Sequence, residues 1–348
     1  MATSARPRIL LIRRRHLGDV VLLGSALRNL RLFWPEAHLT VLCEHNFAGV
    51  LPLNPDVNGV LTFPRRFSDW FRLLRALRRA RFTHVLDFDN SDKTSLVTRL
   101  TGSRIRATFE REKNPLRHPR FYTHRAKISD AFYWSNHITE TNLALLTEIG
   151  VPTPSREVRL IPHPEDVTVM GRLVSSYGFK VLIHPGSRSP QRIWPLENFA
   201  KVSDRLQDEH NAQVFVTAGP REKSLIEGIR SRAHTHIVVP DTPRTVGELA
   251  ALISHFDVLL CHDSGPMHIA AAVGTRVVAL FGSQPTVMWR PLGPGHTVLQ
   301  AAMPCACIGD EAPTPCVRTD AYRSYCVRLI SEYEVFDAVA AMRSANDT

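Results

Sequence analysis

Short apolar segments alternate along this chain with segments whose apolar residues recur at helical spacing, and the alternation runs twice. Apolar runs such as Ile9–Ile12 are separated by helical patterns such as Val20–Phe33. Short buried runs predict strands, and strands that alternate with helices form parallel sheets with helical crossovers. The sequence therefore predicts an α/β fold made of two Rossmann-like halves.

The alternation is interrupted over residues 151–175, which contain four prolines. We place a linker there and expect an N-terminal domain over residues 1–160 and a C-terminal domain over residues 161–348. We leave open whether the terminal helix, Ser331–Met342, packs back on the first domain. Residues 103–130 are rich in Arg, Lys, His and Pro and predict an exposed loop.

Positive charge is concentrated in the first half of the chain. Residues 1–160 carry 26 Lys and Arg against 14 Asp and Glu, a net charge of +12, while the remainder carries 17 against 19, or −2. A basic half predicts an anionic partner, such as a phosphorylated lipid surface or a nucleic acid. No apolar run approaches the ~18–20 residues of a membrane helix, and no leader pattern is present, so we expect a cytoplasmic protein.

A polar segment, Arg13–Val21, follows the first predicted strand. Asp19 lies where a helix should begin, so its carboxylate either caps that helix or takes a proton from an attacking hydroxyl group. Gly18 predicts a tight turn that lets a substrate approach the backbone. His16 is an alternative candidate for the base.

The loop over residues 184–195 follows a strand of the second half and leads into a helix. It carries Ser187, Arg188 and Arg192. Backbone amides at a helix start, a hydroxyl group and guanidinium groups bind phosphate well, so the loop predicts a cradle for a diphosphate. An ordinary solvated loop is the alternative.

A third polar segment, residues 262–272, also follows a predicted strand. Its hydroxyl group and amides can donate to phosphate or to sugar hydroxyls, and its carboxylate can accept from sugar hydroxyls. A tight turn with an Asx cap is the alternative, and for the histidine a place in the core. The candidate ligand contacts are Asp263, Ser264, Gly265, Pro266 and His268.

Taken in order, the three segments resemble those of glycosyltransferase family 9, the ADP-heptose:lipopolysaccharide heptosyltransferases. The resemblance extends over nearly the whole chain. It implies a GT-B fold, in which two Rossmann-like domains face each other across a cleft, with inversion at the anomeric carbon, no cofactor and no obligatory metal. It also implies that Asp19 is the general base and that Arg192, where many members have Lys, binds the diphosphate. A carboxylate near Glu222 would hold the ribose, although a surface glutamate is nearly as consistent.

The implied reaction transfers a heptose from ADP-heptose to a lipopolysaccharide inner-core or lipid A-linked acceptor. The basic helix Trp70–Arg81 and the loop 103–127 would then contact the anionic inner face of the inner membrane, with Trp70, Phe71 and Phe82 inserted shallowly; a solvated face is the alternative. A transferase of the same fold that uses another nucleotide sugar remains open, because no residue reports heptose directly.

Two other classes of protein were weighed. A basic nucleic-acid-binding protein is permitted by the charge, but no recognised binding module is present, and we expect no nucleic-acid partner. A dinucleotide-dependent oxidoreductase is disfavoured because no G-x-G-x-x-G follows the first strand.

The cysteines cluster late in the chain, in the spacing C-x-C-x8-C-x9-C. Four thiolates could bind zinc, but the paired C-x2-C spacing of strong zinc sites is missing. We therefore expect reduced, unligated thiols, with a structural metal as the alternative. The residues concerned are Cys305, Cys307, Cys316 and Cys326.

Overall fold

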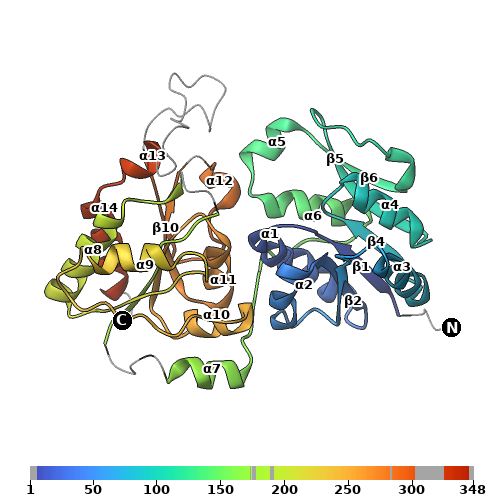
Figure 1. The fold of residues 1–348 in the computed structure, drawn as a ribbon. Coiled ribbons are helices and arrows are strands. Elements are labelled where there is room, and N and C mark those ends of the chain that lie inside the picture. Colours follow the sequence, from blue (N-terminus) through green and yellow to red (C-terminus); the bar gives the residue numbers. More distant parts are fainter. Residues whose placement is uncertain are drawn as a thin grey trace. The chain divides into compact units, whose positions relative to one another are not determined.

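The structure of the protein is a computed structural model that describes residues 6–172, 174, 178–188, 192–282, 284–301 and 325–344. The chain divides into two compact units, Met1–Ile161 and Pro162–Thr348. The described residues of each unit form a parallel sheet flanked by helices (Figure 1), so the predicted α/β class is confirmed. None of the helices in this part of the chain has the length and apolar character needed to cross a bilayer.

The sheet of the first unit has the strand order β3-β2-β1-β4-β5-β6. Strand β1 is central because the side chains of Ile9–Ile12 are fully buried and need cover on both faces. The order of the sheet reverses between β1 and β4, and ligands of open α/β sheets bind beyond the carboxyl ends of the strands at such a reversal. The strands are β1 (Arg8–Ile12), β2 (His38–Glu44), β3 (Gly59–Phe63), β4 (His84–Asp87), β5 (Ile105–Arg111) and β6 (His124–Ile128).

The helix expected over Val20–Phe33 starts earlier and is divided at Leu23. Next to the division, Gly24 packs closely against Val158, whose Cγ1 would lie 3.0 Å from an added Cβ. The α-helices of this unit are α1 (Leu17–Leu22), α2 (Gly24–Phe33), α3 (Asp69–Ala80), α4 (Asp92–Leu100), α5 (Asp130–Ser135) and α6 (Ile138–Glu148), and the 3-10 helices are η1 (His45–Leu53) and η2 (Pro119–Phe121).

The expectation of an exposed loop over residues 103–130 is wrong for β5 and β6, but residues 112–120 between them are mostly exposed, as expected. Strand β6 lies at the edge of the described sheet. Arg125 and Lys127 are exposed there, while Ala126 and Ile128, which alternate with them, are buried. Part of the basic composition therefore lies on the solvated face of an edge strand, where charged residues are common, and part, including Lys113, Arg117 and Arg120, lies in the segment between the two strands.

The sheet of the second unit has the order β11-β10-β9-β7-β8, which reverses between β7 and β9. The strand expected over His236–Val239 is reduced to one bridge between Val238 and Phe215. The strands are β7 (Lys180–His184), β8 (Gln213–Val216), β9 (Val258–His262), β10 (Arg276–Phe281) and β11 (Thr297–Gln300). The helices are α7 (Pro164–Gly171), within the expected linker, α8 (Leu196–His210), α9 (Lys223–Arg230), α10 (Val246–Ile253), α11 (Gly265–Val273), α12 (Thr286–Trp289), α13 (Tyr325–Arg328) and α14 (Glu332–Ser344).

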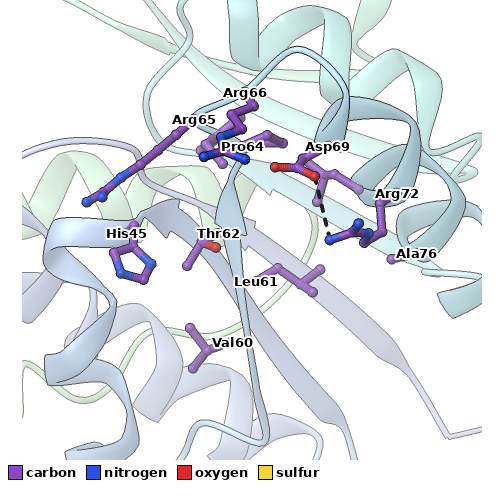
Figure 2. Close-up of a pocket in the computed structure, with 12 residues that line it drawn as sticks. His45, Val60, Leu61, Thr62, Pro64, Arg65, Arg66, Asp69, Arg72 and Ala76 are labelled. Carbon is purple, nitrogen blue, oxygen red and sulfur yellow. Dashed lines mark ion pairs between the residues drawn. The ribbon is translucent and has the colours of Figure 1, made fainter.

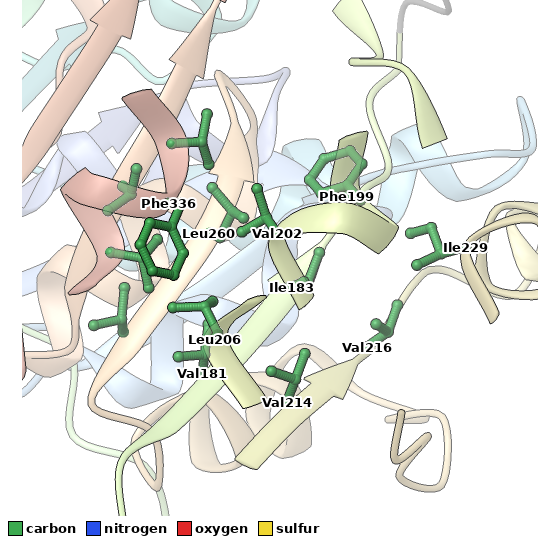
Figure 3. Close-up of a cluster of buried hydrophobic side chains, with 14 of the residues drawn as sticks. Val181, Ile183, Phe199, Val202, Leu206, Val214, Val216, Ile229, Leu260 and Phe336 are labelled. Atoms are coloured by element: carbon green, nitrogen blue, oxygen red, sulfur yellow. The ribbon is translucent and has the colours of Figure 1, made fainter. Parts of the chain in front are cut away.

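The core of the second unit joins its strands to α8 and α14 (Figure 3). Val181 and Leu260 come from the sheet, Phe199 and Leu206 from α8, and Phe336 from α14. The terminal helix α14 thus contributes to the core of the second unit.

Candidate active site

Asp19 lies in the first turn of α1, beyond the carboxyl end of β1. Its carboxylate forms an ion pair with the guanidinium of Arg13, which also donates a hydrogen bond to the carbonyl oxygen of Phe88 after β4. The N-cap of α1 is His16, so the interpretation of Asp19 as the N-cap is wrong. The contacts instead hold an oriented carboxylate where the order of the sheet reverses. Arg13 had no predicted role, although its place directly after a strand is a usable signal.

The tight turn before α1 is made by His16 and not by Gly18. His16 has a φ of 66°, in the left-handed region, and its side chain is exposed. Gly18 is the second residue of α1 and does not have a positive φ. The expectation that Gly18 forms this turn is therefore wrong.

A buried carboxylate, Asp87, organises the loop after β4. Its Oδ1 accepts the backbone N–H groups of Asp89 and Asn90 at 3.0 Å each, and its Oδ2 accepts the Tyr122 hydroxyl at 2.6 Å. Burial raises the pKa of Asp87 to about 6, against the opposing effect of these hydrogen bonds. The loop that offers the Phe88 carbonyl to Arg13 is thus held by a residue that sequence analysis missed.

We expect Asp87 to make stability depend on pH. Its pKa in the folded state is raised above the unfolded value, so the folded chain binds more protons between about pH 4 and 6, and this contribution to stability is lost as pH rises through that window. Two pKa units correspond to roughly 3 kcal/mol. Urea unfolding at pH 4 and pH 7 should show that the Asp87→Asn variant loses this pH dependence; equal pH dependence in the variant and the wild type would contradict it.

In the second unit, Glu222 lies between the loops that follow β7 and β8. Its Oε2 accepts the backbone N–H of Gly219 at 2.9 Å. A Cβ added to Gly186 would lie 2.3 Å from the same oxygen, so a larger residue there would displace the carboxylate. Glu222 is the residue before α9, but it is not simply a surface glutamate, because it contacts both loops at the carboxyl edge of the sheet.

The end of β9 holds the segment that contains Arg192. Arg192 NH1 lies 3.0 Å from Oδ2 of Asp263, and the backbone N–H of Trp194 donates to Nε2 of His262 at 2.8 Å. The solvated-loop interpretation is therefore wrong for this part of the loop. Trp194 and His262 lie in two of the polar segments identified in the sequence, residues 184–195 and 262–272, but their contact joins residues far apart in the chain.

The two histidines at these strand ends are uncharged at neutral pH. Burial lowers the pKa of His262 to about 3, with a smaller effect from His184. Burial also lowers the pKa of His184, although the Glu222 carboxylate opposes the change. The positive charge beside Asp263 therefore comes from Arg192.

The remaining candidates lie in the loop after β7 and at the start of α11. Ser187 is half-buried and Arg188 is exposed. Ser264 is the N-cap of α11, yet among the described residues its buried hydroxyl oxygen has no hydrogen-bond partner. His268 is buried within α11. Gly265 and Pro266 are the first two residues of α11.

A basic pocket of about 560 Å³ lies beside β3 and α3 in the first unit (Figure 2). Arg65, Arg66 and Arg72 line it, and Arg72 pairs with Asp69 at 3.5 Å. The pocket brings together part of the positive charge noted in the sequence.

The aromatic residues expected to insert into a membrane have different environments. Phe71 is 74% exposed, but Phe82 is buried in the core. Trp70 packs against Phe63, with ring centroids 6.1 Å apart. The expectation of insertion is therefore wrong for Phe82, since a core side chain cannot reach a bilayer.

The clustered cysteines are not described by the structure. Cys305, Cys307 and Cys316 lie outside the described residues, as does the side chain of Cys326. Cys43 and Cys261 are buried free thiols.

Comparisons with known proteins place these features in a family. The model of glycosyltransferase family 9 (heptosyltransferase) matches residues 70–316, more than half of the chain. The chain is 27% identical over 292 residues to lipopolysaccharide heptosyltransferase 3 of Escherichia coli K12, covering 80% of this chain and 83% of that protein.

Solved structures show the same fold. A family 9 glycosyltransferase from Veillonella parvula has a TM-score of 0.83 at 21% identity, covering 98% of this chain and 99% of its own. The Escherichia coli ADP-heptose lps heptosyltransferase II has a TM-score of 0.80 at 20% identity, covering 98% and 100%.

Proposed function

Since the chain belongs to glycosyltransferase family 9, we propose that it transfers a heptose from ADP-heptose to a lipopolysaccharide core acceptor, with inversion at the anomeric carbon. The family makes it an enzyme, so nucleic-acid binding is no longer favoured as its function. Transfer of another sugar from its nucleotide remains the second candidate, because relatives near 25% identity do not fix the donor.

The observation that carries the proposal is that acid–base and anion-binding groups occupy the carboxyl ends of separate sheets. The first sheet presents the Asp19 carboxylate, held by Arg13, and the second presents Arg192 with its glycine-containing loops. An inverting transfer needs these two functions: a base for the acceptor hydroxyl and positive charge for the departing diphosphate.

In the proposed reaction, Asp19 accepts the proton of the acceptor hydroxyl while the oxygen of that hydroxyl attacks the anomeric carbon. The bond from that carbon to the diphosphate oxygen breaks, and ADP leaves with its charge held by Arg192 and loop amides. His16 is the alternative base. Glu222 would bind the ribose. We propose that no metal or cofactor is required, as the family resemblance implies, and that Arg192 and the loop amides offset part of the charge of the leaving group. The further donor contacts would be Ser187, Arg188, Asp263, Ser264, Gly265, Pro266 and His268, with Gly18 on the acceptor side.

The basic pocket and the exposed side chains near it support peripheral binding to an anionic membrane. Arg65 and Arg66 line the pocket, and the neighbouring Phe67 is 93% exposed. Basic residues with exposed aromatic rings favour lipid headgroups. We place the enzyme in the cytoplasm, at the inner face of the inner membrane, where a lipid A-linked acceptor is available.

The test is a transfer assay with a panel of nucleotide sugars and deep-rough lipopolysaccharide as the acceptor. We expect product with ADP-heptose and little with UDP- or GDP-sugars. A product with another sugar nucleotide alone would select the second candidate, and no product with any donor would refute the transferase proposal for this acceptor.

Replacing Gly186 with Ala should weaken ADP binding about fivefold. The added methyl group would displace the Glu222 carboxylate, which is proposed to hold the ribose, and the loss of one hydrogen bond costs about 1 kcal/mol. Calorimetric titration with ADP measures the effect. Adding Gly186→Ala to a Glu222→Ala variant should change the affinity little, because the collision is gone. Equal losses in both backgrounds would contradict the proposed cause.

A further inference from the structure

Two side chains that the proposed function assigns to the donor, Arg192 and Asp263, bind each other in this structure. NH1 of Arg192 lies 3.0 Å from Oδ2 of Asp263, and the two side chains are only 24% and 10% exposed. Solvent screens such a pair less than a pair on the surface. A ligand that requires Arg192 must therefore compete with Asp263.

Hydrogen bonds anchor the backbone near each of the two residues of this ion pair. Trp194, two residues after Arg192, donates its backbone N–H to His262, the residue before Asp263, at 2.8 Å. The indole N–H of Trp194 donates to the carbonyl oxygen of Ile330 at 2.9 Å. Both partners of the ion pair thus lie within two residues of anchored backbone, from which their side chains can exchange partners.

We propose that the diphosphate of the donor displaces Asp263 from Arg192, and that the released carboxylate accepts hydrogen bonds from hydroxyl groups of the donor sugar. The inference rests on the proposed function, in which both residues contact the donor. A nucleotide sugar offers a new partner to each residue of the ion pair, its diphosphate to Arg192 and its sugar hydroxyls to Asp263. A free nucleoside diphosphate binds Arg192 but supplies no sugar hydroxyls to Asp263, and its negative charge lies near that carboxylate.

This exchange makes Asp263 a specificity-determining residue, because it favours the intact donor over the nucleotide product. The same competition promotes release of ADP after transfer, since Asp263 pairs with Arg192 again as the diphosphate leaves. Asp263 therefore lowers the affinity for one ligand of the reaction and raises it for the other.

The test is a double-mutant cycle on the full chain, with ADP affinity measured by calorimetry for the wild type, Asp263→Asn, Arg192→Gln and the double variant. We expect Asp263→Asn to bind ADP about fivefold more tightly than the wild type, and to transfer sugar more slowly. In the Arg192→Gln background, the same substitution should change ADP affinity less than twofold. The affinity for AMP, which lacks the second phosphate, should increase less upon Asp263→Asn than the affinity for ADP.

Simple repulsion between Asp263 and the ligand would tighten ADP binding equally in both backgrounds, and that result would overturn the exchange. ADP affinity that is unchanged or weaker in Asp263→Asn would also overturn the exchange. A second variant, Asp263→Ala, is measured as well, and the thermal unfolding of both variants is compared with that of the wild type, to detect a folding defect specific to Asn. Glu209→Gln, which breaks the Arg205–Glu209 pair on α8 (2.7 Å), should leave ADP affinity unchanged. Absence of ADP binding to the wild type would refute the proposed function. Binding of ADP to the wild type without tighter binding to Asp263→Asn would refute the exchange alone.

Discussion

Replacing Asp19 with Asn should slow sugar transfer by about 10²–10⁴-fold, the usual contribution of a general base, while ADP affinity stays within about twofold. The carboxamide keeps the size of the side chain but cannot accept the proton of the acceptor hydroxyl. Because the substitution leaves the nucleotide loops of the second unit unaltered, the loss should appear in kcat. Steady-state kinetics with ADP-heptose, together with ADP calorimetry, separates the two effects.

A matched control comes from the same unit. Asp56 is also buried and lies 3.5 Å from an arginine, Arg28, but it precedes β3 and so belongs to the amino edge of the sheet. Asp56→Asn should keep most of the turnover. Turnover of Asp19→Asn within a few-fold of the wild type would show that another group, with His16 the first candidate, takes the proton.

Replacing Arg192 with Gln should reduce kcat by about 10²–10³-fold, because the guanidinium is proposed to stabilise charge that grows on the departing diphosphate. ADP binding should also weaken, since the ground-state ligand carries the same phosphates. Arg192→Lys should recover part of both losses, as it keeps the charge without the planar set of donors.

The control for this prediction is another arginine of the second unit. Arg244 pairs with Glu248 at 3.3 Å, and its side chain is 84% exposed. Arg244→Gln should leave both kcat and ADP affinity unchanged. Unaltered ADP affinity in Arg192→Gln would contradict the assignment of Arg192 to the diphosphate.

The parts of the fold that could be predicted from the sequence are those whose signal is local. Strand β1 has a continuous apolar run, and the strand expected over Lys180–His184 has the same bounds as β7. Strand β6 was missed because the charges on its solvated face hide the alternation. Helix α4 was missed as well: its core-facing residues include Thr94, Ser95 and Thr98, which carry little hydrophobic signal.

The candidate site shows the same division. The sequence predicted Asp19, Arg192 and Asp263 as candidates because polar residues in the segments that follow predicted strands are informative by position alone. It did not show that Asp87 is buried or that it holds the loop beside Arg13. The burial of the Asp87 carboxylate depends on residues distant in the chain, such as Tyr122, which is 35 residues away. A local sequence pattern carries no information about such contacts.

The sequence by itself determined the period of the elements that have a clear apolar pattern and the polar segments that follow their strands, because both are properties of neighbouring residues. Only the tertiary structure decided which polar groups meet. Arg192 pairs with Asp263 across 71 residues, and Trp194 with His262 across 68. Parallel pairing of β7 with β9 brings these groups together, and the order of strands in a sheet is set by packing over the whole unit, not by any one segment.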